Sequence, residues 1–402
     1  MMSGVVIIGA GHAAGQAAAS LRQAKYDGDI TIIGDEPHIP YQRPPLSKAY
    51  LKGDQSADKV YLRAESFYTD RSIAMRLSTS ATAIDTSAKT VTLSSNETLS
   101  YDHLLISTGS RPRKLSIEGS ELPGIHYLRT MDDVDGLREG MRPDANLVIV
   151  GGGYIGLEVA AVGRELGLNV QVLEMEDRIL QRVTTPEMSA YYHQLHEGRG
   201  VNIRTNTGVT GFAGDTEVKE VICGDQRFPA DIVIVGIGII PNTELAESAG
   251  ITCDNGVVVD DHCRTSDPCV YAAGDCTNHP NPLLDRRLRL ESVPNAMEQA
   301  RVSTANMLGD KKTYAAIPWF WSDQYELKLQ MVGFSADGDT QVLRGDMASN
   351  QFAVFYLKEG KIVAADAVNS PKEFMLCKQL VGKAADPAML ADPEADLKAL
   401  LA

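Results

Sequence analysis

The segment GVVIIGAGHAAG at residues 4–15 joins a run of apolar residues to a turn that contains three glycines. An alanine-rich stretch follows and predicts a helix over 13–24, and the next apolar run leads to Asp35 and Glu36. Glycines let a backbone approach a pyrophosphate, a helix N-terminus offers free N–H groups, and the later acid accepts hydrogen bonds from a ribose. The segment therefore predicts a dinucleotide site formed by Gly9, Gly11, Ala14, Asp35 and Glu36.

The segment LVIVGGGYIGLEVAAVGRELGLNVQVLE at residues 147–174 repeats this arrangement. A glycine-rich turn again follows an apolar run, and Glu174 closes the next run at the expected distance. One such pattern is weak evidence, because glycine turns also occur by coincidence in α/β folds. Two complete strand–helix–strand units favour two nucleotide sites. The residues predicted for the second site are Gly151, Gly153, Tyr154, Ile155, Gly156, Glu174, Gly236 and Gly238.

Two dinucleotides in one chain are typical of a tightly held flavin and a transient nicotinamide donor. The N-terminal site is the better FAD candidate, because the segment YAAGD at 271–275 can bring Asp275 to the ribityl hydroxyls. The FAD-binding domain is then discontinuous, at 1–112 and 245–318, with an NAD-binding domain at 113–244 between its parts. A carboxylate at Glu174 favours a ribose 2′-hydroxyl over a 2′-phosphate, so we expect NADH as the donor.

The charge of the chain excludes several classes of partner. A net charge of −15 argues against nucleic acid or an anionic membrane surface, because phosphate binding uses dense Lys and Arg. The longest apolar runs are far shorter than a membrane span, and no basic residue precedes Arg22 to mark a secretory or transit peptide. We therefore expect a protein that binds neither nucleic acid nor membrane. We also expect a monomer.

The chain has six cysteines and no Cys-x-x-Cys pair. So few cysteines in so long a chain do not indicate a secreted disulfide scaffold, so we expect reduced thiols in a cytoplasmic protein. The group most similar to a metal site is Cys263, Cys269, Cys276 and His279. Its wide spacings lack the tight knuckle of zinc sites, and a strand-like segment at 270–273 lies between the ligands, so no metal is expected. For His193 and His196, three residues apart, a solvated helix face is the default interpretation.

Five segments together resemble a known family. They are GDEPHIPYQRPPLSKAYL (34–51), GGGYIGLE (151–158), YAAGD (271–275), ESVPNAMEQAR (291–301) and PWFWSDQYELKLQMVG (318–333). The chain resembles the FAD-dependent ferredoxin reductases of the putidaredoxin reductase type, which serve bacterial cytochrome P450 and Rieske oxygenase systems. This resemblance implies an α/β chain of the glutathione reductase fold, with two Rossmann-like dinucleotide-binding domains and a C-terminal α+β domain at 319–402. Within the latter, 351–368 predicts two alternating strands joined at Glu359 and Gly360.

The resemblance also implies roles for single residues. Arg43 would approach the FAD pyrophosphate, a task that suits a guanidinium. Lys48 would reach the flavin near N5 and pair with Glu158, which would face the nicotinamide carboxamide and keep the lysine charged. The other residues predicted at the FAD are Thr108, Gly109, Arg129, Gly274, Asp275, Val293 and Trp321.

Plainer interpretations of this pair stay open. Lys48 is alternatively a solvated lysine on a short helix, and Glu158 a solvated helix residue. Because Glu158 follows Gly156 by two positions, it is also expected in the first helical turn, at the pyrophosphate end.

Enzymes of this fold that act on disulfides need a thiol beside the flavin, supplied by the segment after the first strand–helix–strand unit. That segment, 36–53, contains no cysteine. Neither proline nor glutamine replaces a thiolate as a nucleophile. We therefore do not expect disulfide chemistry, and the electrons must leave the flavin for an outside acceptor.

Both tryptophans of the chain lie in PWFWSDQ, at 318–324. The resemblance places Trp321 against the flavin edge, and Trp319, two positions earlier, is expected on the opposite side of the strand if the segment is extended. Either ring would shorten the electron path to a docked iron–sulfur cluster. The alternative is that both rings only seal a seam between domains.

An acidic ferredoxin can dock on this acidic chain only at a local basic patch. The segment 286–312 is rich in Arg and Lys, and the resemblance singles out Arg301 within it. An ordinary charged helix face is the alternative interpretation. The predicted docking residues are Arg301, Arg287 and Arg289.

The function that we expect is an NADH-dependent ferredoxin reductase that contains FAD and passes electrons singly to a [2Fe–2S] ferredoxin. A rubredoxin reductase or a quinone-type reductase of small acceptors is the alternative enzyme. A flavoprotein whose redox state only controls binding would need a basic nucleic-acid surface or an import segment. A structural protein with inactive nucleotide folds would have lost glycines or acids from the motifs, and all of these are present.

Overall fold

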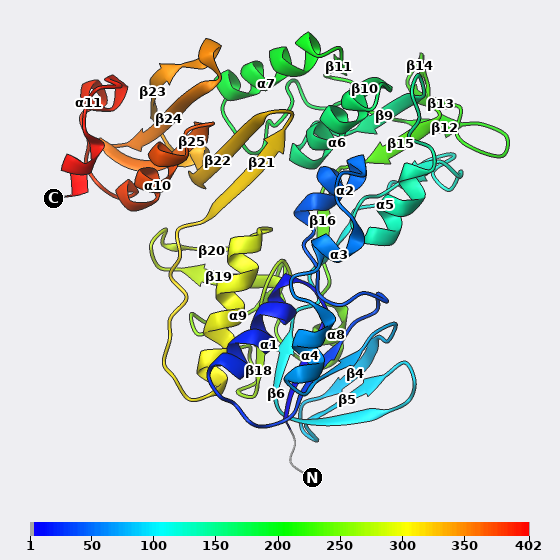
Figure 1. The fold of residues 1–402 in the computed structure, drawn as a ribbon, viewed down its shortest axis with the longest axis vertical. Helices are drawn as coiled ribbons and strands as arrows, with labels where there is room; N and C mark the ends of the chain where they lie inside the picture. Colours follow the sequence, from blue (N-terminus) through cyan, green and yellow to red (C-terminus); the bar gives the residue numbers. More distant parts are fainter. Residues whose placement is uncertain (1–3, 402) are drawn as a thin grey trace. The chain divides into compact units, whose positions relative to one another are not determined.

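The computed structural model describes residues 4–401, which divide into two compact units. Unit 1 comprises 4–43, 56–111 and 239–318, and unit 2 comprises 44–55, 112–238 and 319–401. Figure 1 labels the helices and strands of both units.

The central sheet of unit 1 has seven strands. Five of them run parallel. The other two, β5 (Thr90–Leu93) and β4 (Ala81–Asp85), are antiparallel and extend the sheet from the longest strand, β6 (Thr98–Ile106). The strands in spatial order are β3 (Ile73–Arg76), β2 (Ile30–Ile33), β1 (Gly4–Ile8), β6, β5 and β4, with β18 (Val270–Ala272) also beside β6. The strand predicted at 270–273 is thus confirmed as β18.

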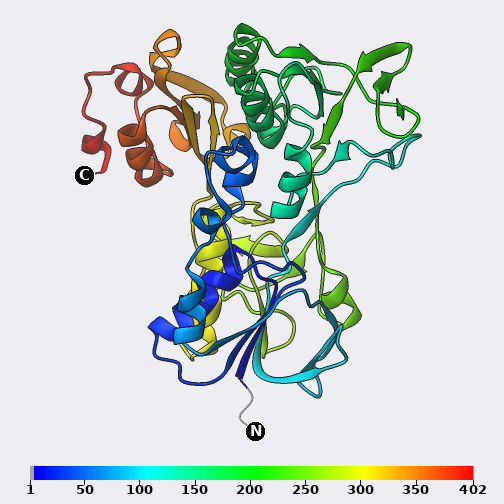
Figure 2. The same cartoon turned by 45° about the vertical axis from the view of Figure 1, so that its right-hand side comes forward.

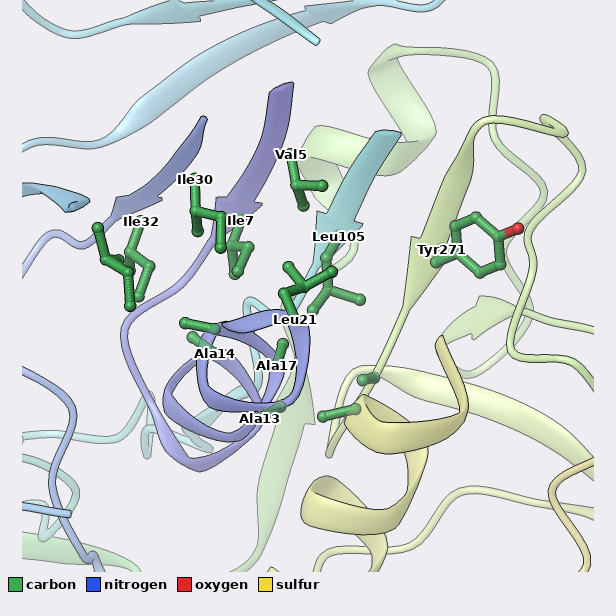
Figure 3. Close-up of a cluster of buried hydrophobic side chains, with 14 of the residues drawn as sticks. Val5, Ile7, Ala13, Ala14, Ala17, Leu21, Ile30, Ile32, Leu105 and Tyr271 are labelled. Atoms are coloured by element: carbon green, nitrogen blue, oxygen red, sulfur yellow. The ribbon is translucent and has the colours of Figure 1, made fainter. Parts of the chain in front are cut away.

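Helix α1 (His12–Gln23) covers this sheet and matches the helix predicted at 13–24 to within one residue at each end. Alanine favours helix, and its small side chain lets the helix lie close to the strands. Figure 3 shows the side chains of β1, β2 and β6 directed toward α1. Helix α9 (Val293–Met307) lies beside α1 in Figures 1 and 2. The buried residues labelled in Figure 3 are Val5, Ile7, Ala13, Ala14, Ala17, Leu21, Ile30, Ile32, Leu105 and Tyr271.

The turn between β1 and α1 requires glycine at Gly9. Its φ angle is +105°, and a Cβ atom there would lie 2.2 Å from the carbonyl oxygen of Ser107. An L side chain would meet both strain and a clash at this position. The close approach of backbone to backbone is what lets the chain turn sharply from the strand end into the helix.

Smaller elements complete unit 1. Strand β7 (Ser110–Pro112) pairs with β16 (Ile239–Pro241), and a three-stranded sheet lies beyond them in sequence. The three strands are β17 (Val257–Val258), β19 (Thr277–Asn281) and β20 (Arg286–Leu288), and the short helices are α3 (Ala57–Val60), α4 (Glu65–Asp70) and α8 (Glu244–Ser248).

The first sheet of unit 2 is parallel and carries the second glycine turn between β9 and α6 (Tyr154–Glu165). Its strands in spatial order are β11 (Asn202–Arg204), β10 (Asn169–Leu173), β9 (Asn146–Val150), β15 (Ile232–Val235) and β8 (Ile125–His126). The other elements around it are η1 (Pro44–Ser47), α2 (Ala49–Lys52), α5 (Met131–Arg138), α7 (Pro186–Gly198), and the antiparallel strands β12 (Gly211–Ala213), β13 (Glu220–Cys223) and β14 (Gln226–Pro229).

The second sheet of unit 2 is antiparallel and has five strands. In spatial order they are β21 (Trp319–Gln324), β22 (Leu327–Gly333), β25 (Lys361–Val368), β24 (Gln351–Lys358) and β23 (Thr340–Asp346). Helices α10 (Pro371–Leu380) and α11 (Pro387–Ala391) lie beside them in Figure 1. The 3₁₀ turns η2 (Ser335–Asp337) and η3 (Met347–Ser349) lie between strands, and η4 (Leu397–Leu401) follows α11. The fold is thus the expected pair of Rossmann-like parts with a C-terminal α+β part.

The two strands predicted at 351–368 exist as β24 and β25, but the expected alternation of buried and exposed residues is wrong. Six of the eight residues of β24 and six of the eight of β25 are buried. Alternation appears only where one face of a sheet meets water. Here α10 packs against β25, while Asp366 on the same strand bonds Thr184, a residue that precedes α7. Both faces are therefore covered.

Candidate functional site

The first glycine turn leaves an open cradle at the N-terminus of α1. Gly11 is the N-cap of the helix, and a Cβ atom built on it would have no neighbour within 4 Å. Ala14 is buried in the first turn of the helix. Backbone N–H groups at a helix N-terminus bind phosphate, so this cradle has the donors and the space that a dinucleotide pyrophosphate requires.

A carboxylate stands at the end of the neighbouring strand β2. Glu36 accepts a 2.5 Å hydrogen bond from the hydroxyl of Tyr41 and a 2.8 Å ion pair from Nη2 of Arg43. Asp35 accepts a 3.1 Å bond from the backbone N–H of Glu36. The structure thus brings the predicted Glu36 and Arg43 together in unit 1, and Tyr41 is a partner that the sequence did not single out.

The segment after β18 supplies further groups to unit 1. Asp275 accepts a 2.9 Å bond from Ser110, and the N–H of Gly274 donates to Oε1 of Gln299 over 2.8 Å. Gln299 is fully buried on α9, and among residues 4–401 its Nε2 has no hydrogen-bond partner. A buried donor without an acceptor is costly, which fits a site that a polar ligand completes. Gln299 lies inside the segment ESVPNAMEQAR, but the sequence did not single it out, because its burial on α9 is known only from the structure.

The other residues predicted at the FAD have mixed settings. The hydroxyl of Thr108 donates a 2.7 Å bond to the carbonyl of Asn242, and Gly109 has a φ angle of +65°. Val293 is the first residue of α9. Arg129 belongs to unit 2, where its backbone N–H donates to Asp133, within the capping box of α5.

The second glycine turn is built like the first. A Cβ atom on Gly151 would lie 2.4 Å from the carbonyl of Gly236, whereas Gly153, the N-cap of α6, faces open space. Glu174, at the end of β10, accepts a 2.6 Å bond from the N–H of Gly152 and a 2.9 Å bond from that of Glu176. The predicted acid is therefore held against the glycine turn by backbone donors. The remaining predicted residues of this site are Tyr154, whose hydroxyl donates to Sδ of Met331 over 2.8 Å, Ile155, which is exposed on the first turn of α6, Gly156, which is packed against Gly151, and Gly238, whose φ angle is +101°.

Lys48 and Glu158 form an ion pair in unit 2, with 2.6 Å between Nζ and Oε2. Lys48 is the N-cap of α2, and its Nζ also donates to the carbonyl of Pro44 over 3.3 Å. The hydroxyl of Ser47 donates to Oε2 of Glu158 over 2.5 Å, and that of Ser322 donates to Oε1 over 2.6 Å. Three donors thus surround one carboxylate.

This geometry corrects the plainer interpretations of the pair. Glu158 is 3% exposed, so it is not a solvated helix residue. The side chain of Lys48 is 18% exposed and is held in the ion pair, so it is not a freely solvated surface lysine. Glu158 is also the fifth residue of α6 and lies beyond the first turn, away from the expected pyrophosphate end. The helix begins at Tyr154, two residues before Gly156, which is why counting from Gly156 misplaced it.

The two tryptophans lie on one face of β21. Their ring centroids are 5.8 Å apart, and Lys378 of α10 lies 4.5 Å from the ring of Trp319. The expectation that Trp319 and Trp321 face opposite sides was wrong, because residues two apart on a strand point the same way. Phe320 takes the other side, with its ring 5.4 Å from that of Tyr154. Both tryptophans are partly buried, so packing and an exposed edge are compatible.

The three arginines predicted for docking lie in unit 1 and are engaged in local contacts. Arg287 bonds the side chain of Asn278 and the carbonyl of Val259. Arg289 pairs with Glu291 over 2.6 Å. Arg301 pairs with Glu298 over 2.9 Å, and both of these side chains are 46% exposed.

The histidine and cysteine candidates are accounted for by packing. His196 is fully buried, which corrects the solvated face expected for it, whereas His193 pairs with Glu197 over 3.3 Å. All six cysteines are free thiols. In the described range 4–401, no group of three or more His, Cys, Asp or Glu residues is arranged to hold a metal ion. No helix of that same range is long and apolar enough to cross a membrane.

Comparison with known proteins places these features in a family. Residues 3–300 match the pyridine nucleotide-disulphide oxidoreductase model, and residues 319–401 match the reductase C-terminal model. Putidaredoxin reductase CamA of Pseudomonas putida is 44% identical over 407 residues, covering 99% of this chain and 96% of that protein. The ferredoxin–NAD(+) reductase component of the anthranilate 1,2-dioxygenase system of Burkholderia cepacia is 43% identical over 404 residues, with 98% of each covered.

A solved structure agrees with both sequence matches. The crystal structure of the covalent putidaredoxin reductase–putidaredoxin complex superposes with a TM-score of 0.96 at 44% identity, and covers 99% of this chain and 98% of that one. The chain therefore belongs to the pyridine nucleotide-disulphide oxidoreductase family, within its group of ferredoxin reductases that use FAD and NAD(H).

Proposed function

We propose that this protein is an NADH-dependent ferredoxin reductase that passes electrons one at a time to a [2Fe–2S] ferredoxin of a cytochrome P450 or Rieske-type oxygenase system. The observation that carries the proposal is the ion pair between the buried Glu158 and the partly buried Lys48, in a fold with two open glycine cradles. The similar proteins support it, because their names assign them to putidaredoxin and to a dioxygenase system.

In unit 1, the residues present fit FAD. The cradle at Gly11 offers the helix N-terminus to the pyrophosphate, and Glu36 offers a carboxylate to the ribose. Arg43 adds a guanidinium beside Glu36, and Asp275 adds an acceptor for ribityl hydroxyls. When bound, FAD accepts two electrons from NADH at once and releases them singly.

In unit 2, the residues present fit NADH. Gly153 leaves space for a pyrophosphate at the N-terminus of α6, and Glu174 stands at the end of the adjacent strand, where an acid distinguishes a 2′-hydroxyl from a 2′-phosphate. The hydrogen bonds from Gly152 and Glu176 fix the position of this carboxylate. Each oxygen of Glu174 keeps a lone pair that can accept a hydrogen bond from a ribose hydroxyl.

The Lys48–Glu158 pair supplies the charges for the electron-accepting step. Glu158 receives three donors and so presents an oriented carboxylate, suited to the amide of a nicotinamide. The ion pair holds Nζ of Lys48 beside this carboxylate in a partly buried position, where a positive charge favours the arrival of negative charge. Removing Lys48 would leave the buried carboxylate of Glu158 without its ion-pair partner.

The electrons leave for an outside protein, because the segment 36–53 has no thiol to receive them. Trp319 and Trp321 on β21 offer aromatic edges for this transfer, and Arg301 offers a positive charge to an acidic ferredoxin. The protein is further proposed to act in the cytoplasm, which six free thiols support, and to act as a monomer. The three-domain division at 1–112 with 245–318, 113–244 and 319–402 is supported by the family match that begins at 319.

The experiment is NADH-driven reduction of cytochrome c, with and without an added [2Fe–2S] ferredoxin. We expect strong stimulation by the ferredoxin, because one-electron exit to an iron–sulfur partner is then the main route. If NADH bleaches the flavin but the ferredoxin gives no stimulation, the partner assignment is overturned. Rubredoxin and quinones would then be the acceptors to compare.

A further inference from the structure

A row of buried side chains continues from Glu158 through unit 2. The hydroxyl of Ser322 donates to Oε1 of Glu158 over 2.6 Å, and Nε2 of Gln324 donates to the oxygen of Ser322 over 3.1 Å. Nε2 of His196 lies 2.8 Å from Oε1 of Gln324. All four residues are at most 3% exposed. The row joins three elements, since Glu158 lies on α6, Ser322 and Gln324 on β21, and His196 on α7.

The donors in this row all point toward the carboxylate. The amide oxygen of Gln324 can only accept, so the hydrogen of the neutral imidazole must be on Nε2 of His196. Burial lowers the pKa of His196 to about 4, against an opposing effect of its bond to Gln324, so the ring is neutral at ordinary pH. Its Nδ1 is then an acceptor, and the hydroxyl of Tyr325 lies 3.4 Å from it. Each group donates to the next and accepts from the one before.

A one-way row of this kind is specific in what it stabilises. It ends on the Glu158 carboxyl group, whose two oxygens both have donors, Ser322 at Oε1 and Ser47 with Lys48 at Oε2. Buried polar groups of this number serve packing poorly, because apolar side chains of the same size would avoid the cost of desolvation. A fully satisfied buried network instead fixes the orientation of its members.

We propose that Ser322, supported by Gln324 and His196, is a positioning residue for the step in which NADH reduces the flavin. The inference rests on the proposed role of Glu158 in that step. Ser322 holds Oε1 of Glu158 from β21, which leaves Oε2 to Ser47 and Lys48. The strand that carries the two tryptophans thereby also sets the carboxylate on the NADH side.

The first experiment removes the hydroxyl with Ser322→Ala in the FAD-loaded protein and follows flavin bleaching by NADH in a stopped-flow instrument. We expect the limiting rate constant to fall about tenfold, as for the loss of one hydrogen bond to a charged group. The apparent Kd for NADH should change little. Ser322→Thr keeps a hydroxyl and should recover most of the rate.

The matched control is Ser370→Ala. Ser370 is buried in the same unit, and its hydroxyl donates to the backbone carbonyl of Val368 over 3.0 Å, away from this row. Its variant should bleach at the wild-type rate. Equal slowing in both alanine variants would mean a general loss of packing and would overturn the proposal.

Glu158→Gln separates this inference from the function on which it rests. If Glu158→Gln leaves bleaching unchanged, the assigned role of the ion pair fails. If Glu158→Gln slows bleaching while Ser322→Ala does not, only the positioning role fails. If Ser322→Ala raises the KM for ferredoxin but not the bleaching time, Ser322 serves the docking strand and the proposal is again overturned.

A measurement without turnover examines the row directly. In protein labelled with ¹⁵N-histidine, His196 should give the signals of the Nε2–H tautomer. Gln324→Leu removes the acceptor of that hydrogen and should shift these signals, together with a slower bleaching by NADH. A His196 spectrum typical of the Nδ1–H tautomer would reverse the direction of the row and overturn the inference.

Discussion

The hydroxyl of Tyr356 donates a 2.8 Å hydrogen bond to Oδ2 of Asp366, a carboxyl group that is buried in strand β25. Thr184 donates a second bond to the same oxygen over 3.1 Å. Burial raises the pKa of Asp366 to about 6, although both hydrogen bonds act to lower it. The antiparallel sheet of unit 2 is therefore joined to the segment before α7 at a carboxyl group whose pKa is about 6.

The stability of the protein should depend on this group in a defined pH window. Between the unfolded pKa of about 3.9 and the folded value of about 6, the folded chain binds more protons, so its contribution to stability falls as pH rises. Asp366→Asn keeps an acceptor and cannot ionise. Relative to wild type, it should gain about 2 kcal/mol between about pH 4.5 and pH 7.5.

Urea unfolding followed by circular dichroism at these two pH values measures the difference. The control is Asp225→Asn, an exposed carboxyl in the turn between β13 and β14, which should change stability equally at both. A pH-independent effect of Asp366→Asn would show that the carboxyl keeps an ordinary pKa in the folded chain.

Glu174 should decide between the two nicotinamide donors. Glu174→Arg replaces a charge that repels a 2′-phosphate with one that attracts it, so the ratio of kcat/KM for NADH to that for NADPH should fall by about tenfold or more. Glu174→Gln is the control for the weakened hydrogen bonds from the backbone N–H groups of Gly152 and Glu176. It should lower kcat/KM for NADH and for NADPH by a similar factor. Unchanged NADH and NADPH kinetics in Glu174→Arg would refute the assignment to the ribose.

Local pattern was sufficient to predict both nucleotide cradles. A glycine turn between an apolar strand and a helix is determined by neighbouring residues, so β1 with α1 and β9 with α6 could be placed from sequence. The environment of Glu158 could not, because Ser322 lies 164 positions away and meets it only through the packing of β21 on α6. The pairing with Lys48 came from the resemblance and not from spacing.

The predictions that the structure corrects concern the two tryptophans, His196 and the strands β24 and β25. Strand periodicity was available for Trp319 and Trp321, and it places them on one face. The burial of His196 and of both faces of β24 and β25 depends on which elements cover them. Such coverage is a property of the assembled domains, which a run of residues does not reveal.

The two open glycines should separate the two cofactors. A Cβ atom on Gly11 or on Gly153 would meet no other protein atom within 4 Å, so alanine at either position should leave folding unaffected. It would instead occupy the space of a pyrophosphate. Gly11→Ala should therefore lose FAD, with its affinity reduced about tenfold or more, as for an overpacked site.

Gly153→Ala is the matched counterpart. It should retain FAD at the wild-type level and raise the KM for NADH. Flavin content after gel filtration and the kinetics with ferricyanide measure the two effects. If Gly153→Ala also loses FAD, or if Gly11→Ala keeps it, the assignment of the two cradles is reversed or wrong.

Arg301 should act only in the step that involves the ferredoxin. Its side chain is 46% exposed and pairs with the equally exposed Glu298, so reversing the charge should disturb the fold little. Arg301→Glu should raise the KM for an acidic ferredoxin about tenfold and leave NADH-to-ferricyanide activity intact.

Arg227→Glu is the control, since Arg227 forms a similar exposed pair with Glu220 on the hairpin of β13 and β14. Raising the ionic strength should narrow the difference between Arg301→Glu and wild type, because salt screens exposed charges. If both activities of Arg301→Glu fall together, or if Arg227→Glu raises the ferredoxin KM equally, Arg301 does not mark the docking surface.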